Sequence, residues 1–126
     1  MPQLEVNSIH TSYGLSQVLF GISLSVEPGQ VISLIGRNGV GKTTTMRSII
    51  GLTPASSGNI VFEGTDITNL PAYKISRLGV GFVPEERRIF PQLSVWENLD
   101  IARRNSDKND SWDEERVFAL FPDLRD

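Results

Sequence analysis

The sequence predicts an α/β fold with an antiparallel β subdomain at its front, and three observations carry that prediction. Residues 3–9 and 18–26 hold partly alternating apolar side chains, the pattern of two antiparallel strands. Residues 31–35, Val-Ile-Ser-Leu-Ile, are short and densely apolar, as in a strand buried on both faces of a parallel sheet. A glycine-rich loop follows this strand at once, and residues 42–50 then read as a helix that ends at Gly51.

Further elements continue the α/β order. Ser12-Tyr13-Gly14 is a turn-rich connection between the first two strands, and residues 59–62 form another short strand. Pro71 is placed to start a helix that runs to Leu78. Residues 80–83 are a second candidate for a buried parallel strand, which Pro84 ends.

The C-terminal third is expected to be helical. Ser94 and Glu97 have the spacing of a capping box, which opens a helix to about residue 104. Residues 105–110 are a polar linker. Ser111 and Glu114 repeat the capping-box spacing and open a last helix, which Pro122 closes.

Composition narrows the class of protein. At 126 residues the chain is long enough for one domain with a real core. The net charge of -3 argues against a nucleic-acid partner, since affinity for a phosphate backbone rests on clustered Lys and Arg. The absence of cysteine and the single histidine exclude thiolate and His-pair metal sites. No apolar run approaches the roughly 18 residues that span a bilayer, so we expect a cytoplasmic protein with no direct membrane insertion.

The loop after residues 31–35 has the spacing G-x-x-x-x-G-K-[ST], which predicts a phosphate-binding loop. Glycines let backbone N–H groups approach phosphate oxygens, and the N-terminus of the following helix favours the same anion. The chance alternative is a plain glycine-rich turn, but a strand before the loop and a helix after it are the confirming context. The sequence therefore predicts a nucleoside triphosphate site with Mg²⁺, for ATP with GTP as the alternative, built from Gly36, Arg37, Asn38, Gly39, Val40, Gly41, Lys42 and Thr43.

Individual roles follow from the chemistry of the side chains. Lys42 is predicted to reach the β- and γ-phosphates as a catalytic cation, and the Thr43 hydroxyl to ligate Mg²⁺. Thr44 is placed to add a further hydroxyl or backbone donor.

With these features the chain resembles the ATP-binding subunit of an ABC transporter. Asn38-Gly39 within the loop is typical of that family, Tyr13 matches its adenine-stacking aromatic, and residues 83–99 resemble its Q-loop region. The resemblance implies a P-loop NTPase of ABC type, with parallel core strands, an N-terminal antiparallel β subdomain and the start of a helical subdomain. It implies as partners a membrane-embedded permease and a second ATP-binding subunit, and a peripheral place on the inner face of the plasma membrane.

One segment narrows the resemblance further. Val-Pro-Glu-x-Arg-Arg-Ile-Phe over residues 83–90 is similar to ATP-binding subunits of branched-chain amino-acid importers and their urea and amide relatives. Glu85 stands where the family usually has glutamine, and it is interpreted as a catalytic and Mg²⁺-binding carboxylate, the alternative being a solvated glutamate. Arg87 and Arg88 either contact the permease or are simply solvated.

Some family features are missing from the sequence. There is no Ser-Gly-Gly signature, no apolar strand that ends in Asp-Glu, and no histidine after the phosphate loop. Residues 1–126 are therefore expected to be an incomplete N-terminal portion of the nucleotide-binding domain, with the Q-loop region at 83–93 and the helical subdomain beginning at about 94. Such a chain alone should bind nucleotide weakly or fold imperfectly, and should not hydrolyse ATP at a family-like rate. The alternatives are a non-catalytic nucleotide-binding module and a different P-loop enzyme such as a nucleotide kinase, which Asn38-Gly39 disfavours.

Overall fold

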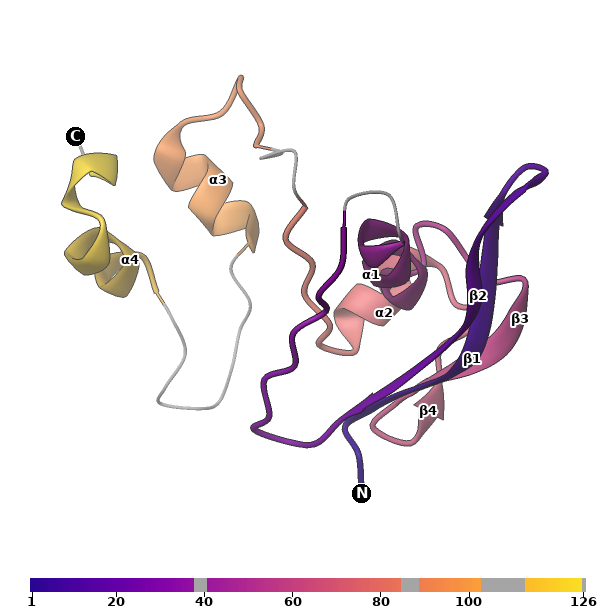
Figure 1. The fold of residues 1–126 in the computed structure, drawn as a ribbon. Coiled ribbons are helices and arrows are strands. Elements are labelled where there is room, and N and C mark those ends of the chain that lie inside the picture. The colour runs from indigo at the N-terminus through magenta and orange to yellow at the C-terminus, as the bar shows by residue number, and fades with distance from the viewer. Residues whose placement is uncertain (38–40, 85–88, 103–112, 126) are drawn as a thin grey trace. The chain divides into compact units, whose positions relative to one another are not determined.

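The computed structural model describes residues 1–37, 41–84, 89–102 and 113–125 (Figure 1). The chain forms two compact units, Met1–Phe82 and Val83–Asp126. Within the described ranges, no helix is both long enough and apolar enough to cross a membrane.

A four-stranded sheet organises the first unit, with strand order β2-β1-β3-β4 and every neighbouring pair antiparallel. Its strands are β1 (Leu4–Tyr13), β2 (Ser16–Val26), β3 (Ser57–Phe62) and β4 (Thr65–Asp66). The antiparallel strands predicted at 3–9 and 18–26 are confirmed. The predicted connection at 12–14 is wrong for its first two residues, because β1 continues to Tyr13 and the reversal takes only residues 14–15. Gly14 allows this tight turn with a φ of 60°.

Two helices cover one face of this sheet, α1 (Lys42–Ile50) and α2 (Ala72–Arg77) (Figure 1). Both were predicted, and α1 begins and ends at the predicted residues. Gly51 ends α1 in the left-handed conformation, with a φ of 84°, and its N–H bonds back to the last turn. The buried apolar core comes from the sheet and both helices: Val6, Ile9, Leu19, Ile49, Ile50, Ile60, Ile67 and Ile75.

The two predicted parallel strands are not formed in the part of the chain that the structure describes. Residues 31–35 and 80–83 lie in irregular connections, and neither segment pairs with a strand. A parallel strand needs neighbours supplied by other crossover units, and the strands described here are all paired antiparallel. Val31 and Ile35 are consequently 92% and 94% exposed, whereas Val80 and Phe82 pack partly buried against the core.

The described residues of the second unit form two short helices and one turn of 3₁₀ helix: α3 (Val95–Ala102), α4 (Glu114–Leu120) and η1 (Pro122–Leu124). The predicted capping box of α3 is confirmed, since Ser94 N–H donates to Glu97 Oε1 at 3.0 Å and Glu97 N–H donates to Ser94 Oγ at 3.1 Å. The end predicted for this helix, at about residue 104, lies outside the described residues.

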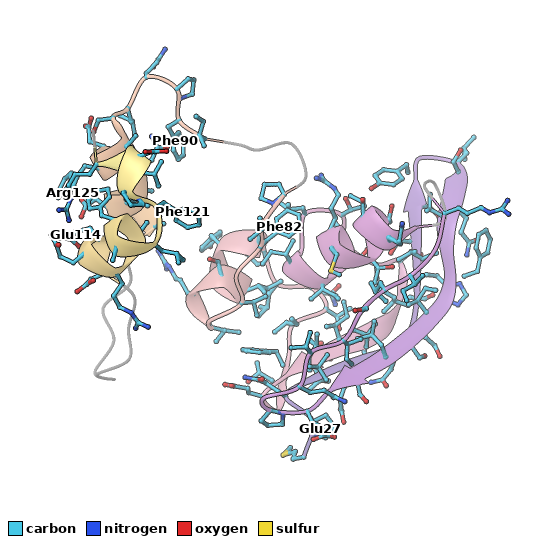
Figure 2. The ribbon with its side chains drawn as sticks, turned by 60° about the vertical axis from the view of Figure 1, so that its left-hand side comes forward. Glu27, Phe82, Phe90, Glu114, Phe121 and Arg125 are labelled. Atoms are coloured by element: carbon cyan, nitrogen blue, oxygen red, sulfur yellow. The ribbon has the colours of Figure 1, made fainter. Side chains whose placement is uncertain are left out.

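The start of α4 differs from the prediction. Its N-cap is Asp113, whose side chain accepts a hydrogen bond from Arg116 N–H at 2.9 Å. A carboxylate caps a helix as well as a hydroxyl does, and the cap predicted at Ser111 lies outside the described residues. Near the end of the chain (Figure 2), Arg125 pairs with Glu115 at 2.9 Å and its guanidinium lies over the ring of Phe118, which joins η1 to α4.

Candidate nucleotide-binding site

The N-terminus of α1 is held against β2 by a glycine. Gly41 precedes the helix with a φ of 97°, which L side chains rarely adopt. A Cβ on Gly41 would lie 2.7 Å from Leu19 Cδ2, so no larger residue fits without a shift of the β2 side chain. The Gly41 carbonyl then accepts from Thr45 N–H at 2.8 Å and from Thr45 Oγ1 at 2.7 Å, which fixes the first turn.

This first turn is where an anion is favoured. The initial N–H groups of a helix have no carbonyl partner within it, and the helix dipole places partial positive charge at the same end. Lys42 and Thr43 are the first two residues of α1, and no acidic residue stands in the first turn. The backbone and side chains of this turn therefore form an electropositive end.

Lys42 also joins the two ends of the predicted phosphate loop. Its Nζ donates to the carbonyl oxygen of Gly36, six residues earlier in the chain. Gly36 and Arg37 are exposed, while residues 38–40 of the loop lie outside the described residues. The ammonium group thus lies at the entrance of the loop, near both of its ends.

Tyr13 lies beside the same helix. Its hydroxyl is 3.3 Å from Thr44 Oγ1, and its side chain is 47% exposed. Thr44 is only 6% exposed, so its hydroxyl faces Tyr13 from within the protein. The structure therefore brings together the aromatic residue and the phosphate-loop helix, which are separated by 31 positions in the sequence.

The pKa of Tyr13 lies below its ordinary value of 10.0. Hydrogen bonds from Thr44 and then Thr53 are the largest causes, and the positive charge of Arg47 acts in the same direction. Arg47 Nε in turn donates to Thr53 Oγ1 at 3.2 Å. Sequence reasoning did not foresee Arg47 or Thr53, because their contact with Tyr13 depends on how β1 packs against α1 and no local pattern encodes it.

Three further residues singled out from the sequence fall in a segment that the structure does not describe. Glu85, Arg87 and Arg88 lie in the segment 85–88, outside the described residues. Across residues 1–37, 41–84, 89–102 and 113–125 there is no group of three or more His, Asp or Glu side chains that could hold a metal ion. The predicted Mg²⁺ site is thus represented in the structure by Thr43 alone.

Comparison with known proteins places this chain in a family. The family model described as ABC transporter matches residues 19–124. The high-affinity branched-chain amino acid transport ATP-binding protein BraG of Pseudomonas aeruginosa is 38% identical over 124 residues, which is 98% of this chain and 53% of that protein. The lipopolysaccharide export system ATP-binding protein LptB of Escherichia coli K12 is 38% identical over 99 residues, which is 79% of this chain and 41% of that protein.

Solved structures agree in fold. The structure of an ATP-binding subunit of an ABC transporter matches with a TM-score of 0.70 and 31% identity, over 79% of this chain and 41% of that one. A nucleotide-free ATP-binding cassette from an ABC transporter matches with a TM-score of 0.69 and 30% identity, over 99% of this chain and 53% of that one. The chain spans about half the length of the relatives that it matches. It belongs to the ATP-binding subunits of the ABC transporter family.

Proposed function

We propose that this chain binds the triphosphate of Mg-ATP at the N-terminus of α1. The observation that carries the proposal is the hydrogen bond from Lys42 Nζ to the Gly36 carbonyl oxygen. This bond places the ammonium group beside the first turn of α1, between the two ends of the predicted phosphate loop. When a triphosphate is present, Lys42 would neutralise part of its charge and the first-turn N–H groups would donate hydrogen bonds to its oxygens. Thr43 and Glu85 would hold the Mg²⁺, which supplies further charge neutralisation. Tyr13 would stack on the adenine ring.

The complete protein, in this proposal, couples ATP hydrolysis to import of branched-chain amino acids. The support is the relative from Pseudomonas aeruginosa, which matches 98% of this chain, together with the residue pattern at 83–90. Its partners would be a permease and a second ATP-binding subunit, and it would lie on the cytoplasmic face of the membrane through that permease. Lipopolysaccharide export is the second candidate, because LptB has the same sequence identity to this chain as BraG, 38%, over a shorter stretch of 99 residues. Import of urea or amides is a third.

A pair of chimaeras separates these substrates. Residues 1–126 would replace the matching half of BraG in one chimaera and of LptB in the other. Restored uptake of radiolabelled leucine by the first, without restored lipopolysaccharide export by the second, supports the amino-acid assignment. The reverse pattern contradicts it.

The 126-residue chain by itself is proposed to bind ATP without appreciable turnover. The sequence contains neither a Ser-Gly-Gly signature nor an apolar strand ending in Asp-Glu, and these supply the trans donors and the water-activating base in the family. Lys42 and the first-turn N–H groups would still hold the phosphates, but without the base and the trans donors the attacking water would not be activated. Phosphate release at rates ordinary for ABC ATPases, lost in Lys42→Ala, would contradict this part of the proposal.

Calorimetric titration with Mg-ATP tests the binding site. We expect Lys42→Ala to weaken binding by about ten- to a hundredfold, because a charge-assisted contact contributes roughly 1.5–3 kcal/mol. Lys74→Ala is the matched control, since this exposed lysine lies in α2 and its removal changes the net charge equally. A folded wild-type chain that does not bind Mg-ATP, or equal affinities for the two variants, would contradict the site.

A further inference from the structure

Strand β1 is joined to helix α1 by two side-chain hydrogen bonds. Thr11 Oγ1 and Ser48 Oγ are 2.9 Å apart and fully buried, and Tyr13 and Thr44 form the second pair at 3.3 Å. Residues two apart on a strand share a face, and residues four apart on a helix also share a face. The two bonds therefore lie side by side along the contact between β1 and α1.

The outer bond of this pair differs from the inner one. The inner bond joins two buried hydroxyls, and buried polar groups need a hydrogen-bond partner for the fold to be stable. The outer bond joins the hydroxyl end of a half-exposed aromatic ring to the first turn of α1, since Thr44 is the third residue of that helix. Thr53 and Arg47 also interact with the Tyr13 phenol, and Arg47 Nε donates to Thr53 Oγ1 at 3.2 Å.

We propose that the Tyr13 hydroxyl is a positioning group for the nucleotide. Its bond to Thr44 holds the aromatic ring at a fixed place relative to the first turn of α1, so that one ATP meets the ring and the phosphate loop together. A ring already held in place loses less rotational freedom when the ligand arrives, which raises affinity by preorganisation. The inference rests on the proposed ATP site and adds a role for the hydroxyl that is separate from ring stacking.

The test compares two ligands that share phosphates but differ in the base: Mg-ATP and inorganic Mg-tripolyphosphate. Tyr13→Phe keeps the ring and removes the bond to Thr44. We expect it to weaken Mg-ATP binding by about two- to tenfold, the effect of mobilising one side chain, with a clearly smaller change for tripolyphosphate. Tyr73→Phe is the matched control, because this tyrosine lies on α2 with its ring under Arg77, away from Thr44.

Variants at Thr44 test the same bond from the helix. Thr44→Val should lower the ratio of ATP to tripolyphosphate affinity as Tyr13→Phe does, and Thr44→Ser, which keeps a hydroxyl, should recover most of it. The Tyr13→Phe, Thr44→Val double variant should lower the ratio no further than either single variant, since both remove one bond. Full additivity of the two effects would overturn the inference.

Three results are decisive. Unchanged Mg-ATP affinity in Tyr13→Phe overturns the positioning role and leaves the proposed function intact. Equal weakening of Mg-ATP and tripolyphosphate in that variant means that the bond only supports the fold, which also overturns the role. A folded wild-type chain that binds neither ligand contradicts the proposed function itself, and the positioning role falls with it.

Discussion

The hydroxyl of Thr44 lies where the phosphate-loop helix meets the end of β1. It is buried and bonded to Tyr13, so the group that Thr44 can offer to a phosphate is its backbone N–H in the first turn of α1. The helix thereby separates two tasks within one residue. In the proposed site, the main chain would bind the phosphates while the side chain holds the neighbouring aromatic ring.

The pKa of the Tyr13 phenol depends on the same hydrogen bond. Its pKa is lowered first of all by the hydrogen bond to Thr44, so Thr44→Val should raise it towards the ordinary value of 10.0. Ultraviolet absorbance during alkaline titration measures this directly. The sequence has only two tyrosines, so a Tyr73→Phe background leaves Tyr13 as the sole signal. An unchanged midpoint in Thr44→Val would contradict the assigned cause.

The sign of the accompanying stability effect is fixed by linkage. The folded chain releases the Tyr13 proton at a lower pH than the unfolded chain, so the unfolded chain binds more protons between the two pKa values. Through that alkaline window, this group makes folding more favourable as pH rises. The contribution is lost as pH falls through the folded pKa, and at neutral pH the phenol contributes nothing through its ionisation.

At the scale of the elements, the pairing of β1 with β3 depends on a close backbone approach. The register shifts between Asn7 and His10, opposite the start of β3. Gly58 has a φ of 83°, and a Cβ there would lie 2.4 Å from the Ser8 carbonyl oxygen and 2.7 Å from Ile9 Cα. Backbone atoms paired in a sheet cannot move aside as a flexible side chain can. The irregularity in β1 is thus matched to a glycine in its partner.

We therefore expect Gly58→Ala to lower the free energy of unfolding by more than about 3 kcal/mol, since it adds a backbone clash to the cost of a left-handed φ. Gly29→Ala is the matched control. Gly29 has a φ of 76° but nothing lies within 4 Å of its Cβ position, so that variant should cost only about 1–2 kcal/mol for the dihedral angle. Urea denaturation followed by circular dichroism measures both. Equal losses would show that the close approach contributes nothing.

The elements also show which parts of the fold were predictable. The start of α1 at Lys42, its end at Gly51 and the Ser94–Glu97 capping box depend on residues within a few positions, and each was confirmed. The cap of α4 was misplaced because the capping-box spacing pointed to Ser111, whereas a carboxylate nearer the helix, Asp113, is the N-cap. The bond from Tyr13 to Thr44 joins residues 31 positions apart, and no local pattern predicts which hydroxyls such packing brings together.

At the scale of the whole molecule, two apolar segments remain without strand partners. Residues 31–35 and 80–83 have the composition of buried strands, yet Val31, Ile35 and Val83 are each more than nine-tenths exposed. Burial of such side chains contributes about 1.5–3 kcal/mol each, and apolar backbone without a ladder partner readily pairs with another chain. The prediction of parallel strands failed here because their partners must be supplied from elsewhere in space. The same segments should therefore drive association between copies of the chain.

Self-association through the exposed apolar segments can be measured directly. Light scattering should detect reversible self-association of the 126-residue chain at concentrations of about 10–100 μM. Val31→Thr with Ile35→Thr should reduce that association while leaving the melting temperature nearly unchanged, because both side chains are exposed. Leu15→Thr is the control, since Leu15 is fully exposed at the turn between β1 and β2 but stands outside these segments. If Leu15→Thr reduces association as much as the double variant, general surface hydrophobicity is the cause and the unpaired segments are not.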